Sequence, residues 1–111
     1  MSRIDRIASL IKHEVADILL RRVNDSRIGF ITIVDVIVSK DLSHAKIYYS
    51  QLGSDKEKSK TRVGLAAAQK FIRSEVGKAL KTRIVPDLHF FFDESVERGV
   101  YLAGKINDLT R

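Results

Sequence analysis

The 111-residue sequence contains no cysteine and only one proline, Pro86. Without cysteine the chain has no disulfide framework and no cysteine-based zinc site, and it suits a reducing compartment. No apolar run approaches the length of a membrane span, and the first residues lack the apolar segment of a signal peptide. We therefore expect a cytoplasmic protein that does not bind membranes.

Motifs of common enzyme classes are also missing, because the sequence has no Gly-x-Ser-x-Gly, no P-loop and no dinucleotide fingerprint. His44 and His89 each lack a partner at metal-ligand spacing. Four acids straddle a predicted strand and the start of a predicted helix, where carboxylates cap the helix and complement its dipole. These acids are Asp87, Asp93, Glu94 and Glu97. The sequence thus predicts no catalytic residues, no metal site and no cofactor.

The positive charge is concentrated in one region. The formal net charge of the chain is +6, but residues 56–83 hold nine Lys and Arg against two Glu, a net +7. The rest of the chain has 11 basic and 12 acidic residues. A concentrated positive field attracts polyanions, and nucleic acid is the commonest of these.

The first half of the chain predicts a helix followed by a hairpin. Ser2 and Asp5 form a capping box, and apolar residues then recur at helical spacing on one face as far as Ile18, so the helix should end near Arg22. Residues 30–39 and 45–52 are rich in β-branched and aromatic residues, and their short link predicts an antiparallel hairpin. The alternation changes phase at Asp35, which predicts a β-bulge there.

A long basic helix should follow. Ser54 and Glu57 form a second capping box, and the helical pattern continues to about Thr82. Unbroken, this helix would be about 40 Å long, more than a domain of this size comfortably covers. We therefore expect a break or bend between residues 60 and 70.

The last predicted strand follows Pro86, which keeps the residue before it out of helical geometry. In this strand Phe90 and Phe92 should face the core, while His89 and Phe91 should lie on the other side. A final helix or loosely docked tail should occupy the residues after about 98. The order is helix, strand, strand, bent helix, strand, helix, which predicts one α+β domain over residues 1–111.

Five stretches taken together resemble the ribosome-binding factor A family of bacterial and organellar small-subunit assembly factors. The most specific is Ser-Lys-Asp-Leu-Ser-His-Ala-Lys at residues 39–46, followed by the order Ile-Arg-Ser, Gly-Lys and Arg-Ile-Val-Pro. The five stretches are residues 24–29, 34–36, 38–48, 71–78 and 83–88. The resemblance covers the chain from its first helix to about Arg98.

The resemblance implies a type II KH-like domain, with a three-stranded sheet and helices on one face. It also implies binding to ribosomal RNA of the small-subunit precursor during late maturation and processing, without enzymatic activity. Release would follow once the subunit matures, and an assembly GTPase is a candidate partner in that step. We expect the protein to act as a monomer.

One departure from the family concerns its central helices. Standard KH domains hold RNA with a Gly-x-x-Gly loop, and none occurs here. The family typically has an Ala-x-Gly kink at this place, where this chain has Ala68, Gln69 and Lys70. Lysine resists backbone geometry that glycine permits. The apolar stripe also keeps its phase from Leu65 to Ile72, so we expect a shallower kink than in relatives.

Basic residues of the long helix are the predicted RNA contacts. They are Lys60, Arg62, Lys70, Arg73, Lys78, Lys81 and Arg83. Lys70, Lys78 and Lys81 lie opposite the apolar stripe and should face solvent. Contacts from lysine to phosphate would be salt-dependent and would carry little sequence information. Arg73 and Arg83 are the better candidates for oriented contacts, because a guanidinium matches phosphate geometry.

Two other classes of function stay open. A general single-stranded RNA- or DNA-binding module would use the same charge, with Phe91 and Tyr48 as base-stacking groups. An enzyme would need an exposed polar residue essential for activity, and the sequence offers no good candidate. The binding face could also lie on the first helix, which carries four arginines: Arg3, Arg6, Arg21 and Arg22.

Overall fold

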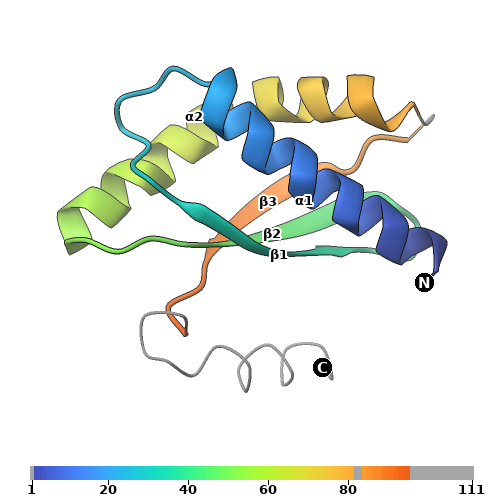
Figure 1. The fold of residues 1–111 in the computed structure, drawn as a ribbon, viewed down its shortest axis with the longest axis horizontal. Coiled ribbons are helices and arrows are strands. Elements are labelled where there is room, and N and C mark those ends of the chain that lie inside the picture. Colours follow the sequence, from blue (N-terminus) through green and yellow to red (C-terminus); the bar gives the residue numbers. More distant parts are fainter. Residues whose placement is uncertain (1, 82–83, 96–111) are drawn as a thin grey trace.

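The computed structural model describes residues 2–81 and 84–95 and has five regular elements (Figure 1). They are α1 (Arg3–Arg21), β1 (Thr32–Val38), β2 (His44–Ser50), α2 (Asp55–Leu80) and β3 (Asp87–Phe92). The α+β class and the order of these five elements are as predicted. The expected final helix or tail, together with Glu97 and Arg83, lies outside the described residues.

Both helices begin at the predicted capping boxes. The Ser2 side chain accepts a hydrogen bond from the Asp5 amide, and the Asp5 side chain accepts one from the Ser2 amide. Ser54 and Glu57 repeat this arrangement at the start of α2. Each box satisfies two helix N–H groups that have no partner within the helix, so the sequence determines where both helices start.

The sheet has the order β1-β2-β3, with β1 antiparallel and β3 parallel to β2. The register between β1 and β2 shifts between Ile33 and Asp35, which confirms the predicted β-bulge. Both hairpin strands are shorter than predicted. Pairing ends at Thr32 opposite Ser50, so Phe30 lies in the preceding loop with 88% of its surface exposed.

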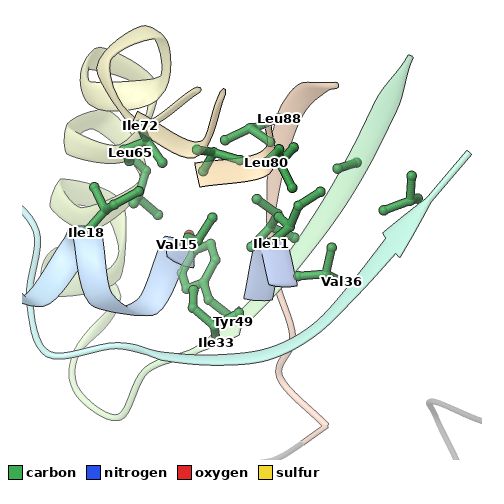
Figure 2. Close-up of a cluster of buried hydrophobic side chains, with 14 residues drawn as sticks. Ile11, Val15, Ile18, Ile33, Val36, Tyr49, Leu65, Ile72, Leu80 and Leu88 are labelled. Carbon is green, nitrogen blue, oxygen red and sulfur yellow. The ribbon is translucent and has the colours of Figure 1, made fainter. Parts of the chain in front are cut away.

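Both helices pack on one face of the sheet, and the core lies between the two layers (Figures 1 and 2). Alternate strand residues point into this core, including Ile33, Ile47 and Leu88, whereas Phe90 and Phe92 pack at its margin, partly buried. The helices contribute a row of buried aliphatic side chains. These are Ile11, Val15 and Ile18 from α1 and Leu65, Ile72, Val76 and Leu80 from α2. Each such side chain stabilises the fold by about 1.5–3 kcal/mol, so these helix faces are firmly held.

The long helix α2 bends without breaking. Its 26 residues form one continuous helix through Ala68, Gln69 and Lys70. Figure 1 shows the first and second halves of α2 running in different directions, so the predicted bend is present. The change of direction keeps both halves over the sheet, and Leu65 and Ile72 are both buried. That the bend is shallower than in relatives stays a prediction.

Candidate nucleic-acid interface

The predicted RNA-binding residues on α2 fall into two rows. The outer row is Lys60, Lys70 and Lys78. The inner row is Arg62, which lines clefts beside β3, and Arg73, which contacts the segment before β3. At helical spacing Lys70 and Lys78 lie opposite the buried stripe of α2 and Arg73 lies at its edge, whereas Lys60 and Arg62 flank the stripe on opposite sides. All five residues are exposed.

In the outer row, Lys60 and Lys70 are exposed lysines that form no ion pair with any residue in the described parts of the chain. The reason is local, since α2 has no acid between Glu57 and Glu75. The Glu57 carboxylate is already engaged in the capping box with Ser54. Hydrogen bonds from the Ser54 amide and hydroxyl are the main causes of its lowered pKa, and the charge of Lys60 adds less. The ammonium groups of Lys60 and Lys70 are therefore available to an anionic ligand.

Lys78 differs from the other two lysines of the outer row. Its Nζ lies 2.8 Å from Glu75 Oε2, although 74% of the side chain is exposed. Arg22 Nη1 lies 2.7 Å from the other oxygen of Glu75, which joins the end of α1 to α2. The two cations, Lys78 first, lower the pKa of Glu75. Lys78 therefore offers an anion less net charge than its exposure suggests.

Arg73 of the inner row contacts the segment of the chain that precedes β3. Its Nη2 donates to the Val85 carbonyl at 2.7 Å, and its Nε donates to the Pro86 carbonyl at 3.2 Å. The same Nε lies 3.1 Å from a carboxylate oxygen of Asp87. The guanidinium thus holds the segment before β3 against α2. The contact of Arg73 with phosphate stays a prediction. A bound phosphate would have to compete with the two carbonyls and with Asp87 for the N–H groups of the guanidinium.

Arg62 lines a cleft between the start of α2 and the end of β3. The cleft has a volume of about 510 Å³, and Tyr49, Phe92 and Glu94 also line it. Lys58 lies across it with Nζ 5.1 Å from the centre of the Phe92 ring, a cation–π distance. Burial raises the pKa of Tyr49, and the nearby charge of Arg62 opposes that rise. The cleft combines cations with aromatic surface, the combination that nucleotides bind.

A second, smaller cleft of about 250 Å³ continues along β3. Arg62 lines it too, together with Gln69 from α2 and His89 and Phe91 from β3. Gln69 Nε2 donates to the Leu88 carbonyl, so the middle of α2 is tied to the edge strand. The sequence did not reveal this role of Gln69 or the position of Lys58 over Phe92, because both depend on the distance between α2 and β3.

The other predicted site residues are placed separately. Lys81 follows α2 in the left-handed conformation, with φ of 55°, and is exposed. Ala68 is partly buried against the core. Of the seven predicted contacts, Lys60, Lys70 and Lys81 are exposed and form no ion pair with a described residue, Lys78 pairs with Glu75, and Arg62 lines both clefts.

The two histidines that are far apart in sequence come together in the sheet. Parallel pairing of β2 and β3 places His44 Nδ1 3.0 Å from His89 Nε2, within hydrogen-bond distance. Within the described residues, no group of three or more His, Asp or Glu side chains is arranged to hold a metal ion. Of the nearby acids, Asp87 pairs with Arg73, and Asp93 accepts hydrogen bonds from the Ser95 amide and hydroxyl.

Within residues 2–81 and 84–95, neither helix is long and apolar enough to cross a membrane.

Comparison with known proteins gives one consistent result. The family model described as ribosome-binding factor A matches residues 3–106. The ribosome-binding factor A of Dictyoglomus thermophilum is 47% identical over 108 residues, which cover 96% of this chain and 90% of that protein. The protein of the same name from Staphylococcus carnosus is 46% identical over 107 residues, covering 96% and 93%.

Solved structures agree with the sequence comparison. The crystal structure of ribosome-binding factor A from Thermus thermophilus matches with a TM-score of 0.68 at 20% identity, over 81% of this chain and 96% of that one. A homology model of the Thermus thermophilus factor, fitted into a cryo-EM map of its 30S complex, matches with a TM-score of 0.59 at 19% identity, over 82% and 91%. At these identities the likeness is one of fold, and the predicted KH-like fold is confirmed.

Proposed function

This chain belongs to the ribosome-binding factor A family, and from that premise we propose that it binds the ribosomal RNA of small-subunit precursors during late maturation. The outer row of α2 lysines and the cleft beside β3 form the contact surface. The protein acts in the cytoplasm as a monomer and catalyses no reaction. Its release follows maturation of the subunit, and an assembly GTPase assists that release.

The observation that carries this proposal is the exposure of Lys60 and Lys70 without ion-pair partners in the described parts of the chain. The arginines at the C-terminal end of α1 are less available, because Arg21 pairs with Asp17 and the C-cap Arg22 pairs with Glu75. A cation already paired with a carboxylate must exchange that partner for phosphate and gains less free energy from doing so. The outer row is therefore the favoured phosphate-binding face.

Binding energy alone is sufficient for the proposed mechanism. The two packed layers present the lysines and the cleft in a fixed arrangement, so they fit one RNA conformation better than another. The protein shifts the RNA equilibrium only by the difference between its affinities for the two conformations. A precursor conformation that matches this surface is thereby stabilised until later changes in the RNA remove the match.

Reversing the charge of the outer row tests the proposal. The double variant Lys60→Glu/Lys70→Glu should fold normally, since exposed substitutions usually change stability by less than about 0.5 kcal/mol each. It should lose co-sedimentation with small-subunit precursors at moderate salt. The matched control is Arg3→Glu/Arg6→Glu, which makes the same change in net charge on α1.

The control should co-sediment nearly as well as the unchanged protein. If it loses binding while the α2 variant keeps it, the binding face lies on α1 and the proposed surface is wrong. Equal losses in both variants would show that only the total charge matters. Circular dichroism of each variant separates lost binding from lost folding.

A general single-stranded nucleic-acid module is the second candidate function. It is favoured by the aromatic residues exposed beside the cleft, chiefly Phe91. Competition at physiological salt between a small-subunit ribosomal RNA fragment and random RNA of the same length separates the two functions. Preference for the ribosomal fragment supports the assembly factor, and equal affinity supports the module.

A further inference from the structure

The sheet face that the helices leave open carries four aromatic rings on β2 and β3. These residues, the aromatic strip, are His44, Tyr48, His89 and Phe91. The Tyr48 and Phe91 rings lie 5.6 Å apart between centroids at an interplanar angle of 30°. The His44 and His89 rings lie 5.2 Å apart at 40°. Two ring pairs therefore lie side by side on one solvent-facing surface.

Strand geometry explains why the rings gather there. Residues on the open face alternate with the buried Ala45, Ile47 and Leu88. Parallel register places Tyr48 directly opposite Phe91. The ring pairs are separated by about two to four residues along each strand, and a strand rises about 3.3 Å per residue. An extended nucleic-acid strand with splayed bases can reach both pairs.

A purely structural role does not account for the whole strip. Cross-strand ring pairs stabilise sheets, and Tyr48 with Phe91 does so here. That role requires contact between the rings but no exposed ring surface. Phe91 nevertheless exposes 44% of its surface on the edge strand β3. An exposed aromatic surface of this kind is the stacking surface that unpaired bases use.

The charge around the strip suits a phosphate backbone. Lys46 lies between His44 and Tyr48 on β2 and is exposed, with no ion-pair partner among the described residues. Two acids lie on the same face, but each is already engaged. Asp87 pairs with Arg73, and Asp35 accepts a hydrogen bond from the Val36 amide. A cation beside stacked rings favours a ligand with both bases and phosphates.

The strip is also continuous with the cleft described above. His89 and Phe91 line the smaller cleft together with Arg62 and Gln69. A strand of RNA leaving that cleft therefore meets the strip at the edge of β3. This continuity links the open face to the surface on which the proposed function depends.

We propose that the aromatic strip binds unpaired nucleotides of RNA, with bases stacked on Phe91 and Tyr48 and a phosphate at Lys46. The inference rests on the proposed function, because it adds a second contact to the same RNA ligand. The outer row of α2 takes phosphates, whereas the strip takes bases. The protein thus distinguishes RNA with unpaired nucleotides at this position from fully paired RNA.

Removal of the Phe91 ring tests the strip. Phe91→Ala should weaken binding of a short labelled single-stranded oligoribonucleotide by roughly 5- to 150-fold, the effect of losing one stacked base. Binding of a blunt-ended RNA duplex should not change. The matched control is Phe30→Ala, which removes an exposed ring from the loop before β1 and should leave both affinities unchanged.

A second measurement does not depend on the alanine variant folding. The chain has no tryptophan, so Phe91→Trp places a single tryptophan in the strip, whose emission can be excited selectively, while keeping a stacking ring. The single-stranded oligoribonucleotide should bind this variant at least as tightly as the unchanged protein and should quench its emission. The duplex should leave the emission unchanged.

Unchanged emission at saturating oligoribonucleotide, or equal affinities of Phe91→Ala and Phe30→Ala, would overturn the inference. Quenching by intact precursor particles but not by their extracted RNA would assign the face to a ribosomal protein and would overturn it too. Lys60→Glu/Lys70→Glu is measured alongside with both probes. If the Lys60→Glu/Lys70→Glu variant loses binding while Phe91→Ala does not, the inference that the strip binds bases is wrong and the proposed function stands.

Discussion

At the residue scale, two buried positions on α2 hold the loop that precedes β1. Thr61 has no exposed surface, and its hydroxyl accepts a hydrogen bond from the Gly29 amide at 3.0 Å. The same hydroxyl lies 3.5 Å from the Arg27 carbonyl, to which it donates. One turn further along, Gly64 lies beneath Ile28, and a Cβ there would come within 2.6 Å of Ile28 Cγ1. Only a hydroxyl at the first position and a glycine at the second allow this close approach.

Thr61→Val tests the first of these contacts. Valine has nearly the same shape but leaves the Gly29 amide and the Arg27 carbonyl unpaired, so the free energy of unfolding should fall by about 1–3 kcal/mol. Hydrogen exchange at the Gly29 amide should become faster. Thr61→Ser keeps the hydroxyl and should preserve that protection. Equal exchange at Gly29 in both variants would contradict the assigned hydrogen bond.

At the element scale, the turn between β1 and β2 is built around one carboxylate. Asp41 Oδ1 accepts hydrogen bonds from the Ser39 hydroxyl at 2.7 Å and from the Ser43 hydroxyl and amide at 2.6 and 3.1 Å. These bonds, chiefly the one from the Ser43 hydroxyl, lower the pKa of Asp41 to about 2. The turn also holds Leu42 at a φ of 63°, so its conformation needs this support.

The lowered pKa predicts how the stability of the hairpin depends on pH. Because the folded state favours ionised Asp41, its contribution is present above the ordinary carboxyl pKa and is lost as the pH falls through about 2. Asp41→Asn should therefore be less stable than the unchanged protein at neutral pH. The difference should shrink as the pH is lowered through this range. Urea unfolding at several pH values measures it, and a difference independent of pH would contradict the role of the charge.

At the scale of the whole molecule, the two helices turn one face of the sheet into a core, and neither helix covers the other face. Lys70 and Lys78 lie on the outer side of the helix layer, and the aromatic strip lies on the opposite surface of the sheet layer. The clefts beside β3 connect the two at the edge of the molecule. A thin domain of this kind can contact one RNA at its outer helix face, its edge and its open sheet face.

The salt dependence of binding measures the phosphate contacts of the whole surface. The logarithm of the affinity falls with the logarithm of the salt concentration, with a slope of about −0.7 to −0.9 for each phosphate neutralised. Lys60→Gln/Lys70→Gln should therefore reduce the magnitude of the slope by about 1.4–1.8. Arg3→Gln/Arg6→Gln should leave it unchanged. A slope that both variants change equally would place the phosphate contacts outside the outer row.

The amount that could be predicted from the sequence differs between the fold and the site. The capping pair Ser54 and Glu57, and the phase change at Asp35, are local patterns, so the start of α2 and the β-bulge were predicted correctly. Exposure of Lys70 was predicted for the same reason. The engagement of Lys78 by Glu75 was missed, although an acid three positions earlier on a helix is a recognisable signal. No local sequence pattern indicated that Arg73 would contact the Val85 and Pro86 carbonyls.

The sequence by itself determined the elements, the buried stripe and the location of the positive charge, because periodicity, capping and composition act over a few neighbouring residues. Only the tertiary structure decided which charges stay free and which surfaces adjoin. The parallel pairing of β2 with β3 brings together rings 43 and 45 positions apart, and the Arg73 contacts depend on how closely the chain before β3 approaches α2. Such contacts follow from long-range packing, and no local pattern in the chain records them.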